Sequence, residues 1–443
     1  MAFIITISDL EKARATPDFV LDVVKKWQSS TEYNAMLTAQ KYFLGENPAL
    51  QRRWATIQTE AGSFKMKPKQ LVSSDIFKRA IMQYINRLLH YDVSFENVGN
   101  AIETSKDFNG ALLEITYDAA VCGVSYGFWD YSGRVVQIPA MQGIPIVDDT
   151  TGDVVKFIYF WQLAADRPTS YQLFEIDGVT TWSKSGRDTR LTQTQEKVPY
   201  RFKQFKWNSG QTALSSTQNY SRLPIVAMHA NNEKRSELTN PIKSKINVLD
   251  LLMTFYSNEF LDSKFLYWLI NDYGGNLEEL IKIKETVQKL GIIANQSDTG
   301  SIIPQTLSLP HEAFEAMVER LEAQIFNDLM TFNPTALAGS TNIATAIRAG
   351  QYPEDAKISG LQRKVEKFIM EIANIAGIDT GKPSFKHYRL FDEASVSTRL
   401  QGWADRGVPI KTLTRLEPLF ADNYEEINDE IDREMMGYEP DEV

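Results

Sequence analysis

The chain has 443 residues, of which 43% are hydrophobic, 11% aromatic and 23% charged, and this composition excludes an intrinsically disordered protein. Its formal net charge is −10, and the eleven acids and one base that follow residue 416 account for all of it. The other residues therefore balance to zero, which argues against a sequence-specific DNA-binding protein with a basic surface.

No stretch approaches the roughly 18 uninterrupted apolar residues that span a bilayer. The first seven residues lack the basic region and the cleavage site of a secretion signal, so we expect a protein that stays in the cytoplasm where it is made. The single cysteine, Cys122, cannot form an internal disulfide, and four scattered histidines offer little for a metal cluster. We expect no metal and no cofactor.

The pattern of apolar residues in the N-terminal half of the chain predicts a mixed α+β body. Residues 9–93 show two apolar runs at helical spacing, and 112–121 a further helix, whereas 124–230 indicate strands with hairpin-type turns at 130–133 and 149–153. The two helical runs contain Phe19, Leu21, Val24, Trp27, Phe77, Ile81, Ile85, Leu88 and Leu89.

Two long amphipathic helices are predicted in the middle of the chain, over 236–270 and 310–332. Residues 271–309 between them indicate a small module with a short helix and an extended segment. Residues 333–345 are small, polar and uncharged, and such a segment cannot pack a core. A long helix over 346–376 contains Pro353, which predicts a kink. The rest, 377–443, is predicted to form short helices, loops and an acidic tail.

The search for catalytic chemistry finds no site. His311-Glu312-Ala313-Phe314-Glu315 begins like a zinc protease motif but lacks the second histidine. The glycines of 377–384 are too close for a phosphate loop, and Pro383 stands where Ser or Thr binds magnesium, so a loop after a helix is the better interpretation. Cys122, in an apolar run, is typical of a small buried hydrophobe. We expect a protein that is not an enzyme.

A basic and aromatic stretch from Arg187 to Trp207 has two interpretations. Aromatic side chains between cations can stack on nucleic acid bases. The alternation of period two equally fits a β-hairpin whose aromatic side chains face the body of the protein, and it favours the hairpin.

The order of these features resembles the portal proteins of tailed double-stranded DNA bacteriophages. Several motifs are similar to those of that family, and their order and spacing cover nearly the whole chain. They are Trp27 followed by 42–48, the stretch 119–126, Leu223-Pro224-Ile225-Val226 with 231–233 and 236–238, then Lys243, Ile246 and Asn247, and finally 406–413 with Pro418. The chain departs from the family at 342–346, and its region after Gly377 is short.

The resemblance implies an α+β portal-type subunit assembled as a closed dodecameric ring. Residues 1–235 would form a mixed wing, 236–270 and 310–332 the two stem helices, 271–309 a small α/β clip, 333–345 a tunnel loop, 346–376 a long kinked wing helix, and 377–443 a short helical crown with the acidic tail. The ring would be the channel at one capsid vertex for DNA packaging and ejection.

The resemblance also implies partners and a location. Double-stranded DNA would pass without sequence specificity, and the ring would meet the large terminase, a head-completion or adaptor protein, and the major capsid and scaffolding proteins, with no membrane. The protein would belong to the virion, and to the host cytoplasm during assembly. A clip docking surface for partners is expected at Asp272, Tyr273, Glu278 and Lys282.

The charges agree with a channel wall. Residues 310–345 contain five acids and one base, and a wall that does not bind phosphates would not slow DNA. We expect stem acids at Glu312, Glu315, Glu319 and Glu322 to line the channel. The tunnel loop would face the duplex through Asn333, Thr335, Ala336, Leu337, Ala338, Gly339, Ser340, Thr341 and Asn342.

Contacts between neighbouring subunits would cover the apolar stripes of the stem helices. The expected interface residues are Ile246, Leu249, Met253, Met317, Leu321 and Ile325. The alternative is a cytoplasmic carboxylate-dependent hydrolase or a monomeric binding module, for which no ring is needed.

Overall fold

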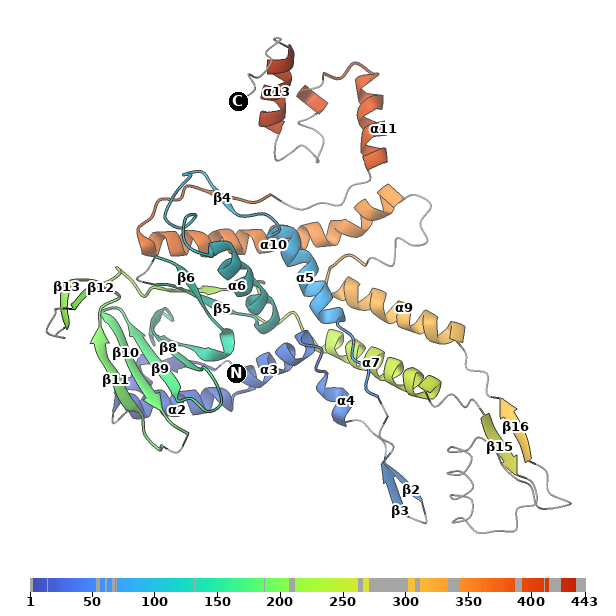
Figure 1. Cartoon of the computed structure of the whole chain (residues 1–443), viewed down its shortest axis with the longest axis horizontal. Coiled ribbons are helices and arrows are strands. Elements are labelled where there is room, and N and C mark those ends of the chain that lie inside the picture. Colours follow the sequence, from blue (N-terminus) through green and yellow to red (C-terminus); the bar gives the residue numbers. More distant parts are fainter. Residues whose placement is uncertain are drawn as a thin grey trace. The chain divides into compact units, whose positions relative to one another are not determined.

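The structure is a computed structural model of the chain, and it has the mixed α+β fold that the sequence predicts (Figure 1). The chain folds into two compact units. Unit 1 comprises residues 1–48, 75–243 and 323–443, and unit 2 comprises 49–74 and 244–322. The structure describes residues 3–13, 15–52, 56–59, 62–65, 68, 70–130, 133–186, 188–206, 212–261, 266–270, 302–306, 311–333, 343–386, 393–409, 411–413 and 424–435.

A six-stranded sheet in unit 1 has the order β1-β7-β8-β9-β10-β11. Strand β1 is parallel to β7, and the other neighbours are antiparallel. The strands are β1 (Ile5–Thr6), β7 (Gly143–Val147), β8 (Val154–Gln162), β9 (Thr169–Glu175), β10 (Gly178–Lys184) and β11 (Thr192–Val198). The hairpin turn predicted at 149–153 joins β7 to β8, as expected.

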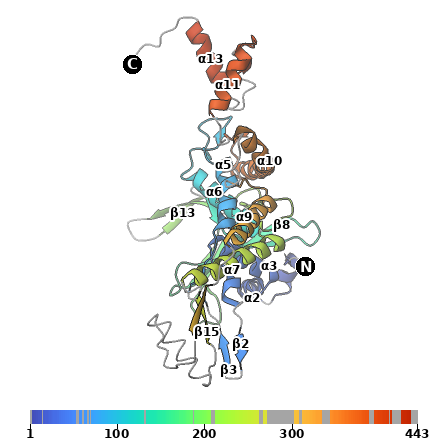
Figure 2. The same ribbon diagram turned by 90° about the vertical axis from the view of Figure 1, so that its right-hand side faces the viewer.

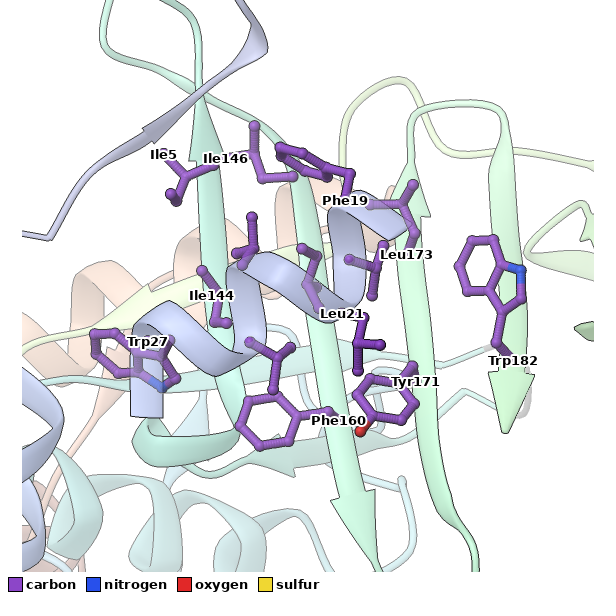
Figure 3. Close-up of a cluster of buried hydrophobic side chains, with 14 residues drawn as sticks. Ile5, Phe19, Leu21, Trp27, Ile144, Ile146, Phe160, Tyr171, Leu173 and Trp182 are labelled. Atoms are coloured by element: carbon purple, nitrogen blue, oxygen red, sulfur yellow. The ribbon is translucent and has the colours of Figure 1, made fainter. Parts of the chain in front are cut away.

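Helix α2 (Thr16–Gln28) lies across this sheet and buries its apolar face on it (Figure 3). The stripe predicted from helical spacing, Phe19, Leu21, Val24 and Trp27, is buried. The indole of Trp27 also donates a hydrogen bond of 2.9 Å to the carbonyl oxygen of Met141. This cluster is the core of the sheet, and it fixes α2 there because buried apolar area dominates the stability of such contacts.

A second layer of unit 1 joins the three-stranded sheet β14-β5-β6 to helices α6 and α10 (Figure 1). Gly127 in β5 permits close packing, since a Cβ atom there would lie 2.4 Å from the ring of Phe368 on α10. These elements are β5 (Ser125–Trp129), β6 (Val135–Ile138), β14 (Ile225–Met228), α3 (Thr31–Phe43), α5 (Ile76–Leu88), α6 (Phe108–Cys122) and α10 (Ile343–Ala376).

Shorter elements complete unit 1. Strands β12 and β13 form an antiparallel hairpin, which confirms the pairing expected for the basic and aromatic stretch. Helix α10 is followed by a loop at Gly377, as predicted. The elements are α1 (Ile7–Glu11), β4 (Ser94–Phe95), η1 (Ala140–Gln142), β12 (Arg201–Lys206), β13 (Thr212–Gln218), β17 (Pro383–Ser384), α11 (Glu393–Ala404) and α13 (Tyr424–Met435).

Unit 2 contains most of helices α7 (Asn240–Leu261) and α9 (His311–Asp328), which lie side by side in both views (Figures 1 and 2). The ring of Tyr256 on α7 stacks on Phe314 of α9 with centroids 3.9 Å apart, and its hydroxyl is hydrogen-bonded to Nδ1 of His311. Two hairpins also belong to unit 2, β2 (Thr56–Thr59) with β3 (Gly62–Lys65), and β15 (Leu266–Ile270) with β16 (Ile302–Thr306). Helix α4 (Pro48–Arg52) has its first residue in unit 1 and the others in unit 2.

Polar side chains one turn apart on α7 hold an extended segment, residues 70–74, along the helix. Asp250 accepts hydrogen bonds from the backbone and the hydroxyl of Ser74 at 2.9 and 2.6 Å. Thr254 and Asn258 pair in the same way with the backbone of residues 72 and 70. Because buried polar groups are costly unless paired, this ladder fixes the segment on α7.

The structure corrects the predicted ends of the long helices. The first runs from 240 to 261 and not from 236 to 270, because Leu266–Ile270 is a strand paired with 302–306. Residues 266–270 are all apolar, and periodicity alone cannot tell whether such a continuous apolar run is a strand or part of a helix. The second helix ends at Asp328 and not at 332. The third begins at Ile343, where the helical pattern of the sequence begins, and not at 346, the start that the portal assignment gives to the wing helix. The hairpin β2–β3 was not predicted at all.

The end of α6 generates a stability prediction. Gly123 has φ +94°, and a Cβ atom there would lie 2.7 Å from the backbone of Arg235. Gly123→Ala should therefore lower the free energy of unfolding by about 2–4 kcal/mol, measured by chemical denaturation. Gly152→Ala is the matched control, because Gly152 has φ +73° but nothing within 4 Å, so it should lose only about 1 kcal/mol. Equal losses in the two variants would show that the contact with Arg235 contributes nothing.

Candidate functional site

One face of α9 carries the four predicted stem acids. Glu312, Glu315, Glu319 and Glu322 are spaced by three or four residues, which on an α-helix places them within an arc of about 80°. The first three are exposed and Glu322 is half-buried. The apolar stripe lies on another face, where Leu321 and Ile325 are buried. Helix α9 thus presents a row of carboxylates on one side and a packing surface on another.

The predicted subunit-contact residues need a correction. Leu321 is 8% exposed, and Ile246, Leu249 and Ile325 are buried more deeply. The single chain already covers these four side chains, so they pack inside the subunit and are not available to a neighbour. Met253 is half-buried, and Met317 is 44% exposed. The sequence pattern could not distinguish burial within one chain from burial between chains, because both produce the same stripe.

Helix α9 ends in a tight C-terminal cap. Thr331 N–H donates to the Phe326 carbonyl at 2.9 Å and Met330 N–H donates to the Asn327 carbonyl at 3.0 Å, the two hydrogen bonds of a Schellman motif. Met330 has φ +53°, a left-handed conformation that costs a non-glycine residue about 1 kcal/mol. The cap turns the chain away from the helix axis, and Phe332 beyond it is buried again.

A half-buried lysine contacts the backbone of this cap. The ammonium of Lys357 on α10 donates to the Leu329 carbonyl at 2.7 Å, pairs with Glu237 at 2.9 Å, and lies 4.2 Å from the centre of the Tyr84 ring. Lys357 is 13% exposed. A charge at this depth is tolerated because it has a carboxylate, a carbonyl and an aromatic face as partners.

A second cation, which is buried, pairs with α10 about three turns from its start. Arg87 on α5, 9% exposed, pairs with Glu354 at 3.2 Å and with Asp355 at 2.6 Å. Glu354 is 2% exposed, and burial raises the pKa of its carboxyl group above the ordinary value although the Arg87 guanidinium acts in the opposite direction. Helix α10 continues on both sides of Pro353, the residue before this pair.

The two cations therefore hold the end of α9 at Leu329 and α10 at Glu354 and Asp355. Of the predicted tunnel-loop residues, Asn333 is described and half-buried, whereas those from Thr335 to Asn342 lie outside the described residues. The predicted clip residues Asp272, Tyr273, Glu278 and Lys282 also lie outside them. Sequence reasoning did not identify Arg87, Glu354 or Lys357. The sequence signal that could have indicated them is that Glu354 and Lys357 lie beside the apolar stripe of α10, which includes Ile358 and Leu361.

Comparison with known protein families shows which family the chain belongs to. The family model for "Phage portal protein, SPP1 Gp6-like" matches residues 25–378 of the 443. The chain belongs to the phage portal protein family. A search of curated proteins found no match to it.

The match covers the portal chain from within α2 to just beyond the end of α10, so the acid face of α9 and both cations lie inside it. Helices α11 and α13 lie outside it.

Cys122 is a buried thiol, and burial raises its pKa. Among the helices in the described part of the chain, none is long and apolar enough to cross a lipid bilayer.

The buried carboxyl of Glu354 generates a pH prediction. A raised pKa means that the folded chain binds the proton more tightly than the unfolded chain does. This contribution to stability is complete below pH 4.5, the ordinary pKa, and is lost as the pH rises through the folded value. The free energy of unfolding should therefore fall less from pH 4.5 to pH 7 in Glu354→Gln than in the unmodified protein. Urea denaturation of both proteins at the two pH values measures this.

Glu114→Gln, at an exposed position of α6, is the control and should follow the unmodified protein. If Glu354→Gln lost as much stability as the unmodified protein over this interval, Glu354 would not be the source of the pH dependence.

Proposed function

We propose that this portal protein forms a closed ring at one capsid vertex, through which double-stranded DNA is packaged and ejected. The observation that carries the proposal is the exposed row of carboxylates on α9 in a chain of the portal family. As the resemblance implies, the ring would be a dodecamer in the virion. It would dock the large terminase and a head-completion protein, contact the capsid and scaffolding proteins, and assemble in the host cytoplasm.

Electrostatics explains why such a wall suits moving DNA. Each cation that neutralises a phosphate releases counterions and adds affinity, which would hold the duplex in place. Carboxylates repel phosphates instead. At physiological ionic strength this repulsion extends about 8 Å, so it would act only on a duplex that drifts close to the wall. The row from Glu312 to Glu322 would thus keep DNA away from α9 without binding it.

The family parts are assigned with the observed boundaries. Helices α7 and α9 would be the stem, and the hairpin β15–β16 extends the clip to about residue 266. Residues 1–235 and α10 would form the wing, and 377–443 the crown. The segment 333–345 would be the tunnel loop. Its small uncharged side chains could contact the duplex without fixing its register, and Lys357 and Arg87 would hold the end of α9 and α10 in the wing.

Cations placed in the tunnel loop should slow the passage of DNA through the ring. Replacing Thr335, Ser340 and Thr341 with lysine puts three cations per subunit next to the duplex, and each phosphate neutralised steepens the logarithmic salt dependence of DNA binding by about 0.9. We expect rings that retain DNA at low salt and release it at high salt. Packaging by particles that carry this variant should slow or stall, and a DNA-protection assay measures this.

The matched control places the same three charges on β11, at Thr192, Gln193 and Gln195, which are exposed. This control should package normally. Packaging that is indifferent to the tunnel-loop lysines would show that the DNA path runs elsewhere.

The exposures on α9 predict two different outcomes for a new charge. Leu321→Asp buries an unpaired carboxylate inside the subunit, so it should destabilise the fold by several kcal/mol and lower the yield of soluble protein. Met317→Glu changes an exposed apolar side chain, and it should leave the thermal midpoint of the subunit nearly unchanged while weakening ring formation. Thermal unfolding and light scattering measure the two effects. If Met317→Glu formed normal rings, Met317 would not lie in the interface between subunits.

A further inference from the structure

A cavity of 610 Å³ lies in unit 1 between β14 and the C-terminal half of α10. Its lining combines buried apolar side chains with charged side chains at its edge. The apolar residues are Leu223, Val226, Phe368 and Ile375, the cations are Arg222, Lys234, Lys364 and Lys367, and the carboxylates are Asp153 and Glu371.

The cations of this cavity are only partly neutralised. Lys367 pairs with Glu371 at 3.7 Å in an exposed contact, which is worth little, and Arg222 donates to the backbone carbonyl of Glu371 at 3.1 Å. Among the residues that the structure describes, Lys234 and Lys364 form no ion pair. The edge of the cavity therefore has an excess of positive charge.

His229 shows that three of these cations converge. Its Nδ1 lies 3.0 Å from the Gly123 carbonyl oxygen, which can only accept, so Nδ1 donates its hydrogen. Burial lowers the pKa of this imidazole, and the ammonium groups of Lys234, Lys364 and Lys367 lower it further. The ring of His229 lines the same cavity as these three lysines.

The position of Lys234 is fixed by its own turn. The amide nitrogen of Asn231 donates to the Arg235 carbonyl at 2.7 Å, and its oxygen accepts from the Arg235 N–H at 3.2 Å. Lys234 itself has φ +54°, a left-handed conformation. The backbone that carries the Lys234 side chain is thus held in place before any ligand arrives.

We propose that this cavity binds the acidic segment 436–443 of this chain, with its carboxylates on the cations and an apolar side chain on the buried floor. The segment follows α13 and lies outside the described residues. Its sequence, Met-Gly-Tyr-Glu-Pro-Asp-Glu-Val, places Glu439, Asp441 and Glu442 within four residues, next to Tyr438. Pro440 disfavours a helix, so the segment can bind in an extended form.

Charge complementarity selects this occupant. The residues after 416 carry the entire net charge of the chain, and the cavity is a described site where cations gather over an apolar floor. A nucleic acid backbone would match the cations but would leave the apolar floor without a partner. Acidic motifs with an aromatic or aliphatic residue satisfy both. This proposal does not depend on the ring or on the DNA channel.

Zero-length carbodiimide cross-linking of the full chain tests the proposal, because it joins a carboxylate to a lysine only when they are in contact. Mass spectrometry should identify cross-links from Glu439, Asp441 or Glu442 to Lys234, Lys364 or Lys367. In the double variant Lys364→Glu, Lys367→Glu the yield of cross-links to Lys234, whose amine is unchanged, should fall at least tenfold, and in the unmodified chain the yield of all these cross-links should fall when the salt concentration rises from 0.05 to 0.5 M. Lys106→Glu, at an exposed position outside the cavity, is the matched control and should leave the yield unchanged.

A charge exchange makes the test independent of folding defects. Adding Glu439→Lys, Asp441→Lys and Glu442→Lys to the double variant should restore cross-links between the segment and residues 364 and 367, now with the reactive groups exchanged. The proposal is overturned if the segment cross-links elsewhere, if the double variant keeps the original yield, or if the exchange restores nothing. It is also overturned if the double variant instead lowers the salt-dependent binding of double-stranded DNA while the cross-links persist.

Discussion

Two cations, Arg87 and Lys357, fix the end of α9 and a point about three turns into α10 within unit 1. Arg87 and Lys357 are each surrounded by oxygen acceptors, and a charge at such depth is stable only with its partners in place. Removing one partner would leave an unpaired buried charge, which costs about 3–5 kcal/mol. The contacts with Leu329 and Glu354 therefore hold the end of α9 and the part of α10 around Glu354 in place.

The rest of the functional account builds on this constraint. A loop that contacts moving DNA must be held by its own subunit, otherwise the force on the duplex would displace it. The carboxylate row of α9 precedes the cap at Met330, and the cap precedes the segment 334–342. In our proposal a repelling wall is thus followed by an uncharged contact, and both belong to a chain of the phage portal protein family.

The sequence predicted those parts of the fold in which local pattern and tertiary packing agree. Helix α2 was predictable because its apolar side chains repeat with helical period and all pack on one sheet. The strand Leu266–Ile270 was not, because its continuous apolar run fits a strand or a helix, and its partner strand begins more than thirty residues later. The cap at Met330 was missed because methionine rarely adopts a left-handed conformation.

The candidate site followed the same rule. The acid row on α9 could be predicted, since its spacing is local. The pairing of Arg87 with Glu354 could not, because 267 residues separate them along the chain. Burial of Leu321 inside the subunit was also beyond the sequence, since a stripe does not reveal which surface covers it.

Negative-stain electron microscopy of the purified full-length chain tests the central claim most directly. The account predicts ring-shaped particles of closed rotational symmetry, with a central opening wide enough for a DNA duplex. A population of monomers, or of open and irregular assemblies without a central opening, would contradict it.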